Sequence, residues 1–228
     1  MKFCNFKGFT LSEVLITIAI IGVVSAMTLP TVINRINDRH NISKLKKVYS
    51  VLSQATVKVN EENPIMYWDT RIDTDYTKII YEYYKPYLQI INDCGCAERA
   101  VGCWSKEPTK ALNGMIYQYA HEYGIGHTYC AVRLNDGTNL SFDTWHPEYL
   151  GVTSKYRTVF FFYVDVNGDK NPNKLGKDVF QFVVTKDKPI LIPAGKDNNS
   201  QKCNKNATDN NAGIDCANKV LIENKISY

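Results

Sequence analysis

Apolar residues form one long run near the start of the chain, over residues 9–33. Between Lys7 and Arg35 the only charged residue is Glu13. About 20 residues of helix span the hydrocarbon core of a bilayer, so this run is long enough to cross a membrane. A carboxylate in hydrocarbon costs roughly 2.5–3.5 kcal/mol on insertion scales, and we therefore expect Glu13 to have a function and a partner.

The next stretch, residues 31–59, alternates apolar and polar positions at helical spacing. Its apolar positions are Val32, Ile36, Leu45, Val48, Leu52 and Val59, with Lys, Asn and Gln between them. This period predicts an amphipathic helix that lies against a globular head. With the apolar run it makes one helix of about 50 residues, weakened only at Gly22 and Pro30.

After a polar break at residues 61–68, the pattern predicts a short helix and then a sheet. Residues 74–84 place Tyr76, Ile79, Ile80 and Tyr83 at helical spacing, and Pro86 ends the segment. Later runs rich in Val, Phe and Tyr predict strands at residues 115–120, 128–134, 139–142, 157–166 and 179–185. Residues 135–137 read Asn-Asp-Gly, a hairpin turn, and the polar residues 196–215 predict irregular structure. The predicted fold class is α+β, with an antiparallel sheet packed on the long helix.

Composition and motif content indicate a head with its own core and argue against nucleic-acid binding and catalysis. The chain has 228 residues, of which 44% are hydrophobic, so the part beyond the long helix can bury a core. A formal net charge of +4 is too small to indicate nucleic-acid binding, and we interpret Lys44, Lys46 and Lys47 as a solvated helix face. Five residues could serve in acid–base chemistry, but they match no catalytic motif, and the chain shows no phosphate-binding motif, so the sequence predicts no enzyme. These candidates are His121, His127, Asp143, His146 and Glu148.

Seven cysteines indicate an exported domain. Cys4 lies in the first eight residues, and the other six are Cys94, Cys96, Cys103, Cys130, Cys203 and Cys216. An even number in an oxidising compartment predicts three disulfides, although a Cys94–Cys96 ring would be strained. A zinc site made by Cys94, Cys96, Cys103 and a histidine is the alternative.

Side chains with oxygen atoms recur at every second position in residues 165–178. Such alternation is typical of the start of a calcium loop, and the candidate ligands are Asp165, Asn167, Asp169 and Asp178. The segment is not an EF-hand, because Lys170 and Gly176 occupy the glycine and glutamate positions. A plain turn stabilised by Asp and Asn side chains is the alternative.

The segment Lys-Gly-Phe-Thr-Leu-Ser-Glu at residues 7–13, followed by about 20 apolar residues, resembles the prepilin leader of type IV pilins and type II secretion pseudopilins. The resemblance implies that prepilin peptidase cuts after Gly8 and methylates the amine of Phe9. The new ammonium group would then pair with Glu13 of a neighbouring subunit, since two buried opposite charges compensate each other. A cleavable signal peptide has a shorter apolar core, and a plain membrane anchor does not account for Glu13.

The resemblance also implies an organisation and a location. Residues 1–8 would be the leader, 9–33 the transmembrane and filament-core helix, 34–60 the amphipathic helix of the head, and 61–228 the globular head. Loss of Lys2 and Lys7 with the leader lowers the net charge to +2. The protein would sit in the inner membrane with its head outside the cytoplasm and then enter a filament. Its partners would be homologous pilin subunits, prepilin peptidase and the inner-membrane assembly platform, with no nucleic acid.

Finer roles remain alternatives. Cys203 and Cys216 resemble the pair that closes the C-terminal loop of many pilins, which favours a type IV pilus. Some pseudopilins carry calcium in a loop at the place of residues 165–178, which favours type II secretion. A minor pilin, a filament-tip adhesin and an envelope-anchored enzyme are further alternatives to a structural subunit.

Overall fold

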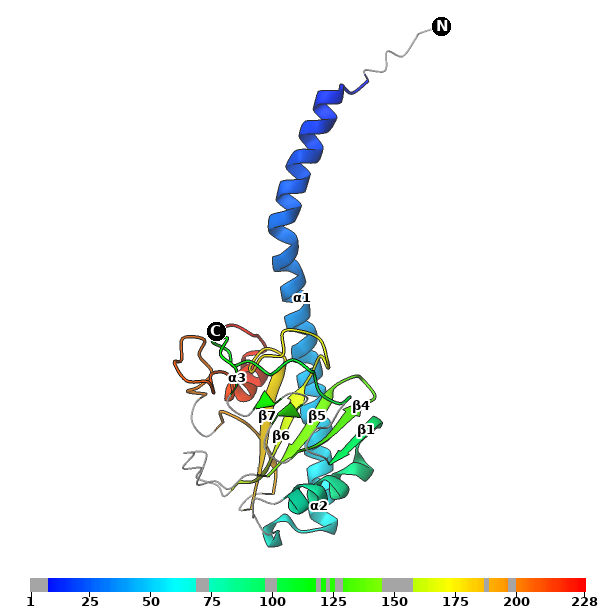
Figure 1. Cartoon of the computed structure of the whole chain (residues 1–228), viewed down its shortest axis with the longest axis vertical. Helices are drawn as coiled ribbons and strands as arrows, with labels where there is room; N and C mark the ends of the chain where they lie inside the picture. The colour runs from blue at the N-terminus through cyan, green and yellow to red at the C-terminus, as the bar shows by residue number, and fades with distance from the viewer. Residues whose placement is uncertain are drawn as a thin grey trace. The chain divides into compact units, whose positions relative to one another are not determined.

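A computed structural model describes residues 8–68, 74–96, 102–117, 120–121, 124–125, 129–144, 158–186, 189–196 and 200–228. The chain divides into two compact units, residues 1–39 and 40–228. Helix α1 (Leu11–Glu62) contributes to both units and continues through Pro30. The long N-terminal helix that the sequence predicts is therefore confirmed (Figure 1).

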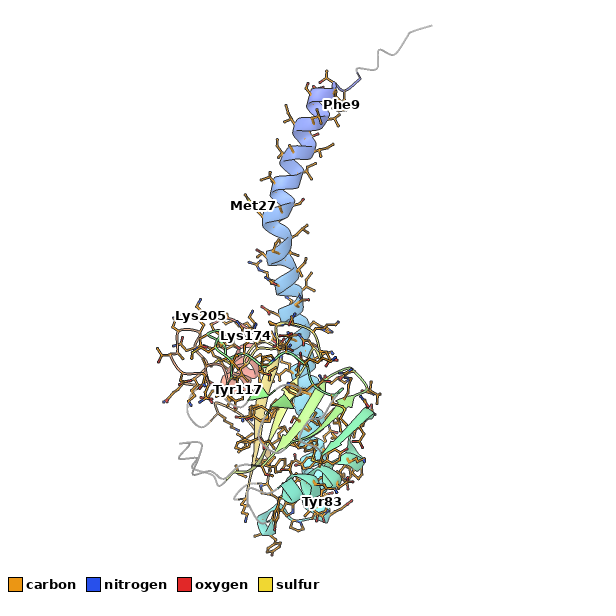
Figure 2. All side chains as sticks on the ribbon, in the orientation of Figure 1. Phe9, Met27, Tyr83, Tyr117, Lys174 and Lys205 are labelled. Atoms are coloured by element: carbon orange, nitrogen blue, oxygen red, sulfur yellow. A yellow bond between two sulfur atoms is a disulfide. The ribbon has the colours of Figure 1, made fainter. Side chains whose placement is uncertain are left out.

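In its described residues, 8–39, the first unit consists of the start of α1 and has no core of its own. None of its described side chains is buried, and they project from α1 on all sides (Figure 2). Among the described residues, α1 is the one helix long and apolar enough to cross a membrane. Exposed apolar side chains on every side need lipid or other helices as their surroundings.

The second unit is a six-stranded antiparallel sheet with helices. Its sheet runs in the order β1 (Ile90–Cys96), β4 (Tyr129–Leu134), β5 (Asn139–Asp143), β6 (Thr158–Asp165), β7 (Val179–Thr185) and β8 (Leu191–Pro193). A small separate pair joins β2 (Ala120–His121) to β3 (Gly124–Ile125). The remaining helices are η1 (Ile65–Tyr67), α2 (Thr74–Tyr84), η2 (Lys85–Tyr87) and α3 (Cys216–Glu223). The predicted α+β class is confirmed.

One face of the sheet forms the main core with α1. The buried face of α1 begins at Asn41 and includes Leu45 and Leu52, whereas Val32 and Ile36 are exposed. Side chains at every second position of β4 to β7 meet this face, as the period of a strand requires. The largest of them are Phe142, Phe160, Phe162, Phe180 and Phe182.

Helix α2 packs against one end of this core. The ring of Tyr84 lies 5.0 Å from that of Phe162 in an edge-to-face arrangement, and its hydroxyl donates to Thr56 Oγ1 of α1 at 3.0 Å. The helix has the predicted bounds, but its buried face is rotated by one position. Tyr81 and Tyr84 are buried, while Ile79 is exposed.

The opposite face of the sheet is covered by the segment that follows Cys103, residues 104–117. Trp104 and Tyr117 pack on Phe161 and Tyr163 there, and the two tyrosine hydroxyls lie 3.1 Å apart. Residues 115–117 form only an isolated bridge with Lys110, so the strand predicted over residues 115–120 is wrong in its described first half. Residues 118–119 lie outside the described residues.

Lysines of α1 hold the β4–β5 turn. Lys44 Nζ donates to the Asp136 carbonyl oxygen at 2.8 Å, and Lys47 Nζ lies 2.9 Å from the Asp136 carboxylate. Burial alone would raise the pKa of Asp136, but Lys47 and Thr138 outweigh it and lower that pKa. This part of the lysine cluster therefore binds the turn, in contrast to the solvated face that the sequence suggested.

Candidate functional site

The start of α1 forms a capping box. Thr10 donates from both its backbone amide and its hydroxyl to Glu13 Oε2, each at 2.8 Å, and the Glu13 amide donates to Thr10 Oγ1 at 3.3 Å. Such reciprocal bonds satisfy free amides of the first helical turn. Glu13 thus has a partner within its own chain, in addition to the neighbouring subunit that the resemblance implies.

Gly8 and Phe9 immediately precede this capping box, and the Phe9 side chain is 87% exposed. A cut after Gly8 leaves the Thr10 amide intact, because that amide joins Thr10 to Phe9. The bonds between Thr10 and Glu13 can therefore persist after processing. Thr10 was not among the predicted site residues, although Thr-Leu-Ser-Glu is a recognisable capping-box pattern at a helix start.

The six cysteines outside the leader form three disulfides. The bonds join Cys94 to Cys103, Cys96 to Cys130, and Cys203 to Cys216. The C-terminal pair is the one that the resemblance implied. The zinc alternative is wrong, because the three cysteines that it required are all oxidised to disulfides.

The loop between β6 and β7 buries two of the four candidate calcium ligands at its ends. Asp178 is fully buried, and its Oδ2 accepts from Asn167 Nδ2 and from the Asn173 amide, both at 3.0 Å. Its Oδ1 accepts from the Lys174 amide at 2.6 Å. Burial raises the pKa of Asp178 to about 6, although these donors oppose the shift.

Asp165 is also fully buried and has an oxygen without a hydrogen-bond partner. Its Oδ1 accepts from the Asn167 amide at 3.2 Å. Among the described residues, Asp165 Oδ2, Asn167 Oδ1 and Asn173 Oδ1 have no hydrogen-bond partner although they are buried. Burial and the Asp178 charge raise the pKa of Asp165 well above its usual range. Three buried acceptor oxygens in one loop thus have no donor among the described residues.

Asp169 is occupied elsewhere. Its carboxylate forms an ion pair with Arg133 at 2.6 Å and accepts from Asn139 Nδ2 at 3.1 Å. Asn173, which was not among the predicted ligands, is buried, and its Nδ2 donates to Ser105 Oγ at 2.8 Å. Within the described residues, no three His, Cys, Asp or Glu side chains lie close enough to share a metal ion. The loop instead combines two carboxylates with amide oxygens.

The acid–base candidates are placed only in part. Asp143 is buried on β5 and His121 lies on β2, whereas His127, His146 and Glu148 lie outside the described residues.

Comparisons with known proteins concern the N-terminal segment. Residues 4–29 match the family described as the prokaryotic N-terminal methylation motif. No curated protein and no solved structure shows significant similarity to the chain. The matched segment contains Gly8, Phe9, Thr10 and Glu13 and ends within the apolar part of α1. The chain therefore carries the leader signature of type IV pilins and pseudopilins.

Proposed function

We propose that the protein is a pilin-like structural subunit that is cut after Gly8, methylated on Phe9 and polymerised through the first half of α1. The methylation motif at residues 4–29 carries the proposal. The exposed apolar side chains of the first unit support it, because a helix that is apolar on all sides is stable only in lipid or among other helices. The head would remain outside the cytoplasm, the inner-membrane assembly platform would be a partner, and an ATPase elsewhere in the machine would supply the energy.

The charge of Glu13 and its capping bonds make separable contributions to this mechanism. In a filament core the Glu13 carboxylate would compensate the ammonium group of Phe9 in an adjoining subunit. The same carboxylate holds the first turn of α1 through Thr10. A glutamine at position 13 keeps an acceptor oxygen for Thr10 but carries no charge.

Expression in the native host tests both steps. We expect mass spectrometry of the purified protein to find methylated Phe9 at the N-terminus, and Gly8→Glu to leave Met1 in place. Glu13→Gln should insert into the membrane but lose filaments in electron microscopy, while Ser12→Ala serves as the control that retains them. Normal assembly by Glu13→Gln would show that capping suffices and that charge pairing is not required. A wild-type protein that retains its leader and stays unassembled would refute the proposed function.

A calcium ion in the β6–β7 loop is the second proposal, and the unsatisfied oxygens support it. Ca²⁺ takes about 6–8 oxygen ligands. Asp165, Asn167, Asn173 and Asp178 would hold it, and Asp169 would stay with Arg133. The ion would neutralise the two buried carboxylates and so fix the loop. We expect Ca²⁺ to raise the melting temperature of the protein and a chelator to reverse the rise, because a ligand of the native state stabilises it. A melting temperature that neither reagent changes would favour the plain turn.

The phenotype of a deletion strain distinguishes the three kinds of filament in which the protein could function. A pseudopilin predicts loss of protein secretion in a deletion strain, and a type IV pilin predicts loss of surface filaments. A filament-tip adhesin would leave filaments in place and abolish attachment.

A further inference from the structure

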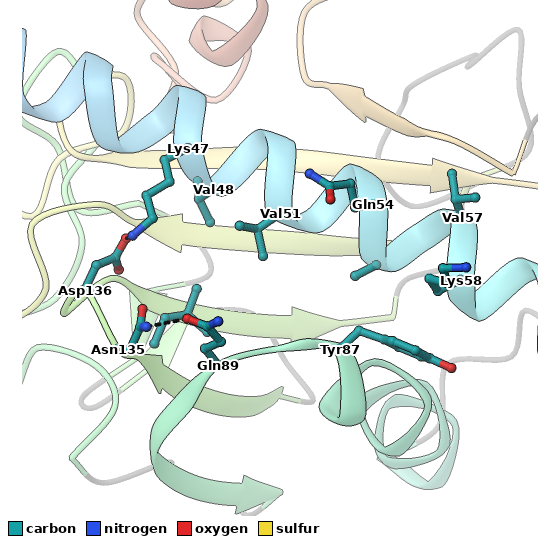
Figure 3. A pocket seen from close by; sticks show the side chains of 12 residues that line it. Lys47, Val48, Val51, Gln54, Val57, Lys58, Tyr87, Gln89, Asn135 and Asp136 are labelled. Atoms are coloured by element: carbon teal, nitrogen blue, oxygen red, sulfur yellow. Dashed lines mark hydrogen bonds and ion pairs between the residues drawn. The ribbon is translucent and has the colours of Figure 1, made fainter.

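A groove runs along the head portion of α1 and has room for a ligand or a partner. It encloses about 620 Å³ between α1 on one side and the η2–β1 connection and the β4–β5 turn on the other (Figure 3). Val48, Val51, Ala55 and Leu134 give it a mostly apolar lining. Val57, at one end, is 50% exposed. All of these residues belong to the unit formed by residues 40–228.

Charges at the rim of the groove are already compensated. Lys47 pairs with Asp136 at 2.9 Å, and Lys58 pairs with Glu61 at 3.1 Å. The other polar lining groups include the amides of Gln54, Gln89 and Asn135, which donate and accept hydrogen bonds without charge. The groove therefore suits an uncharged, largely apolar occupant whose polar groups can hydrogen-bond to these amides.

The same head exposes two neighbouring uncharged, largely apolar side chains, Met66 and Tyr67, on one turn. Tyr67 is 79% exposed, the highest value for a large apolar side chain among the described residues of the head, and Met66 beside it is 58% exposed. Ile65 is fully buried on one side of this pair. On the other side, Trp68 packs on Tyr83 and Phe160.

The turn that carries Met66 and Tyr67 is held by one side-chain and one backbone hydrogen bond. Asn60 Oδ1 accepts from the Ile65 amide at 3.0 Å, and the Tyr67 amide donates to the Pro64 carbonyl oxygen at 3.1 Å. An exposed aromatic side chain on an ordered turn loses little conformational entropy on binding, and Tyr and Met are enriched at the centres of protein interfaces.

We propose that the groove of one copy receives the Met66–Tyr67 turn of a second copy, a contact that rests on the proposed filament. The apolar groove lining would cover Met66 and the Tyr67 ring, and the rim amides would bind the phenol hydroxyl. Turn and groove are different surfaces, so the contact is heterologous, and each pair leaves one free turn and one free groove. Such a contact repeats along a filament instead of closing into a dimer.

Site-specific photocrosslinking in the full chain, expressed in its host, tests the contact. Benzoylphenylalanine replaces Tyr67, and the crosslinked peptides are identified by mass spectrometry. We expect a crosslink between copies that maps to residues 47–58, 87–89 or 134–136. The same probe at Ile222, which is 74% exposed, is the matched control and should not map to the groove.

A second variant tests the groove itself. Val57→Asp places a charge in the groove and should lower the yield of the Tyr67 crosslink about tenfold, since 1.4 kcal/mol corresponds to that factor. Ile222→Asp should leave the yield unchanged, and thermal melts confirm that both variants fold.

Electron microscopy of the same cells separates two kinds of failure. Filaments together with a Tyr67 crosslink to another surface, to another protein or to nothing would overturn this contact alone. Absence of filaments with an uncut leader would overturn the proposed function and the contact together.

Discussion

Asp165 and Asp178 bring two carboxyl groups into the interior of one loop, and both bind protons more tightly there than in an unfolded chain. Without a cation, the free energy of unfolding should therefore fall as the pH rises above about 4, and the contribution of Asp178 to this fall is complete once the pH has passed its folded pKa of about 6. For Asp178, a pKa raised from 3.8 to about 6 corresponds to about 3 kcal/mol. A bound Ca²⁺ would reverse this loss, because it favours the charged carboxylates.

The variant Asp165→Asn tests whether the buried charge of Asp165 lowers stability without calcium and whether calcium binding requires it. The amide oxygen can still accept from the Asn167 amide, while the charge is gone. In a chelator at pH 7 we expect the variant to be about 1–3 kcal/mol more stable than the wild type in denaturant melts. Calcium should stabilise the wild type and have no effect on the variant.

Asp169→Asn is the matched control, because Asp169 lies in the same loop but binds Arg133 at the surface. An exposed ion pair contributes about 0–1 kcal/mol, so this variant should lose little stability and keep its response to calcium. A wild type that is equally stable at pH 4 and pH 7 in a chelator would contradict the assignment of raised pKa values.

At the scale of elements, α1 is one continuous helix with two different surroundings. Its second half is held by a narrow apolar stripe that includes the fully buried Leu45 and Leu52. We expect Leu52→Ala to lower the free energy of unfolding of the head by about 2–5 kcal/mol. Val57→Ala, on the exposed side of the same helix, should change it by less than about 1 kcal/mol, as measured by chemical denaturation.

The C-terminal helix α3 depends on a disulfide at its first residue, Cys216. Ala217 and Val220 of α3 are buried in the main core, and the preceding residues form turns. We expect Cys203→Ser with Cys216→Ser to cost about 3 kcal/mol, the amount assigned to closing a loop of this length. Limited proteolysis should then cut within residues 196–215, whereas resistance equal to the wild type would contradict this role.

The sequence predicted the elements that have a clear residue pattern and a clear end. The bounds of α2 and β7 were predicted correctly, because Pro86 ends the first and β-branched and aromatic residues fill the second. Strand β1 was missed, because Ile-Ile-Asn-Asp-Cys-Gly-Cys lacks alternation and is paired to β4 through bulges and a disulfide. Helix α3 was missed, because eight residues after a polar stretch give too short a pattern.

The candidate sites were predictable where the chemistry is local. Gly8, Phe9 and Glu13 lie within one short motif, and Asp165 and Asn167 are two residues apart. The ion pair between Asp169 and Arg133 was not predictable, because Asp169 lies in the β6–β7 loop and Arg133 on strand β4, 36 residues distant in sequence. Pairing among Cys94, Cys96, Cys103 and Cys130 likewise depends on the register of β1 with β4.

At the scale of the whole molecule, every side chain that the described residues bury belongs to the unit formed by residues 40–228. A chain that starts at His40 should therefore fold without detergent and show one cooperative thermal transition. The full chain should require detergent or lipid, because the first unit exposes its apolar side chains. Light scattering and calorimetry check both expectations, and an aggregated or unfolded head would contradict them.

The bond between Cys96 and Cys130 joins edge strand β1 to its neighbour β4. Hydrogen bonds at a sheet edge can be peeled apart one after another by a pulling force, whereas a covalent link between the two strands cannot be peeled. Forced unfolding is governed by the rate of crossing the unfolding barrier. A fibre built from this protein should thus tolerate tension as long as its surroundings stay oxidising, and a thiol reductant should weaken it mechanically before it dissolves.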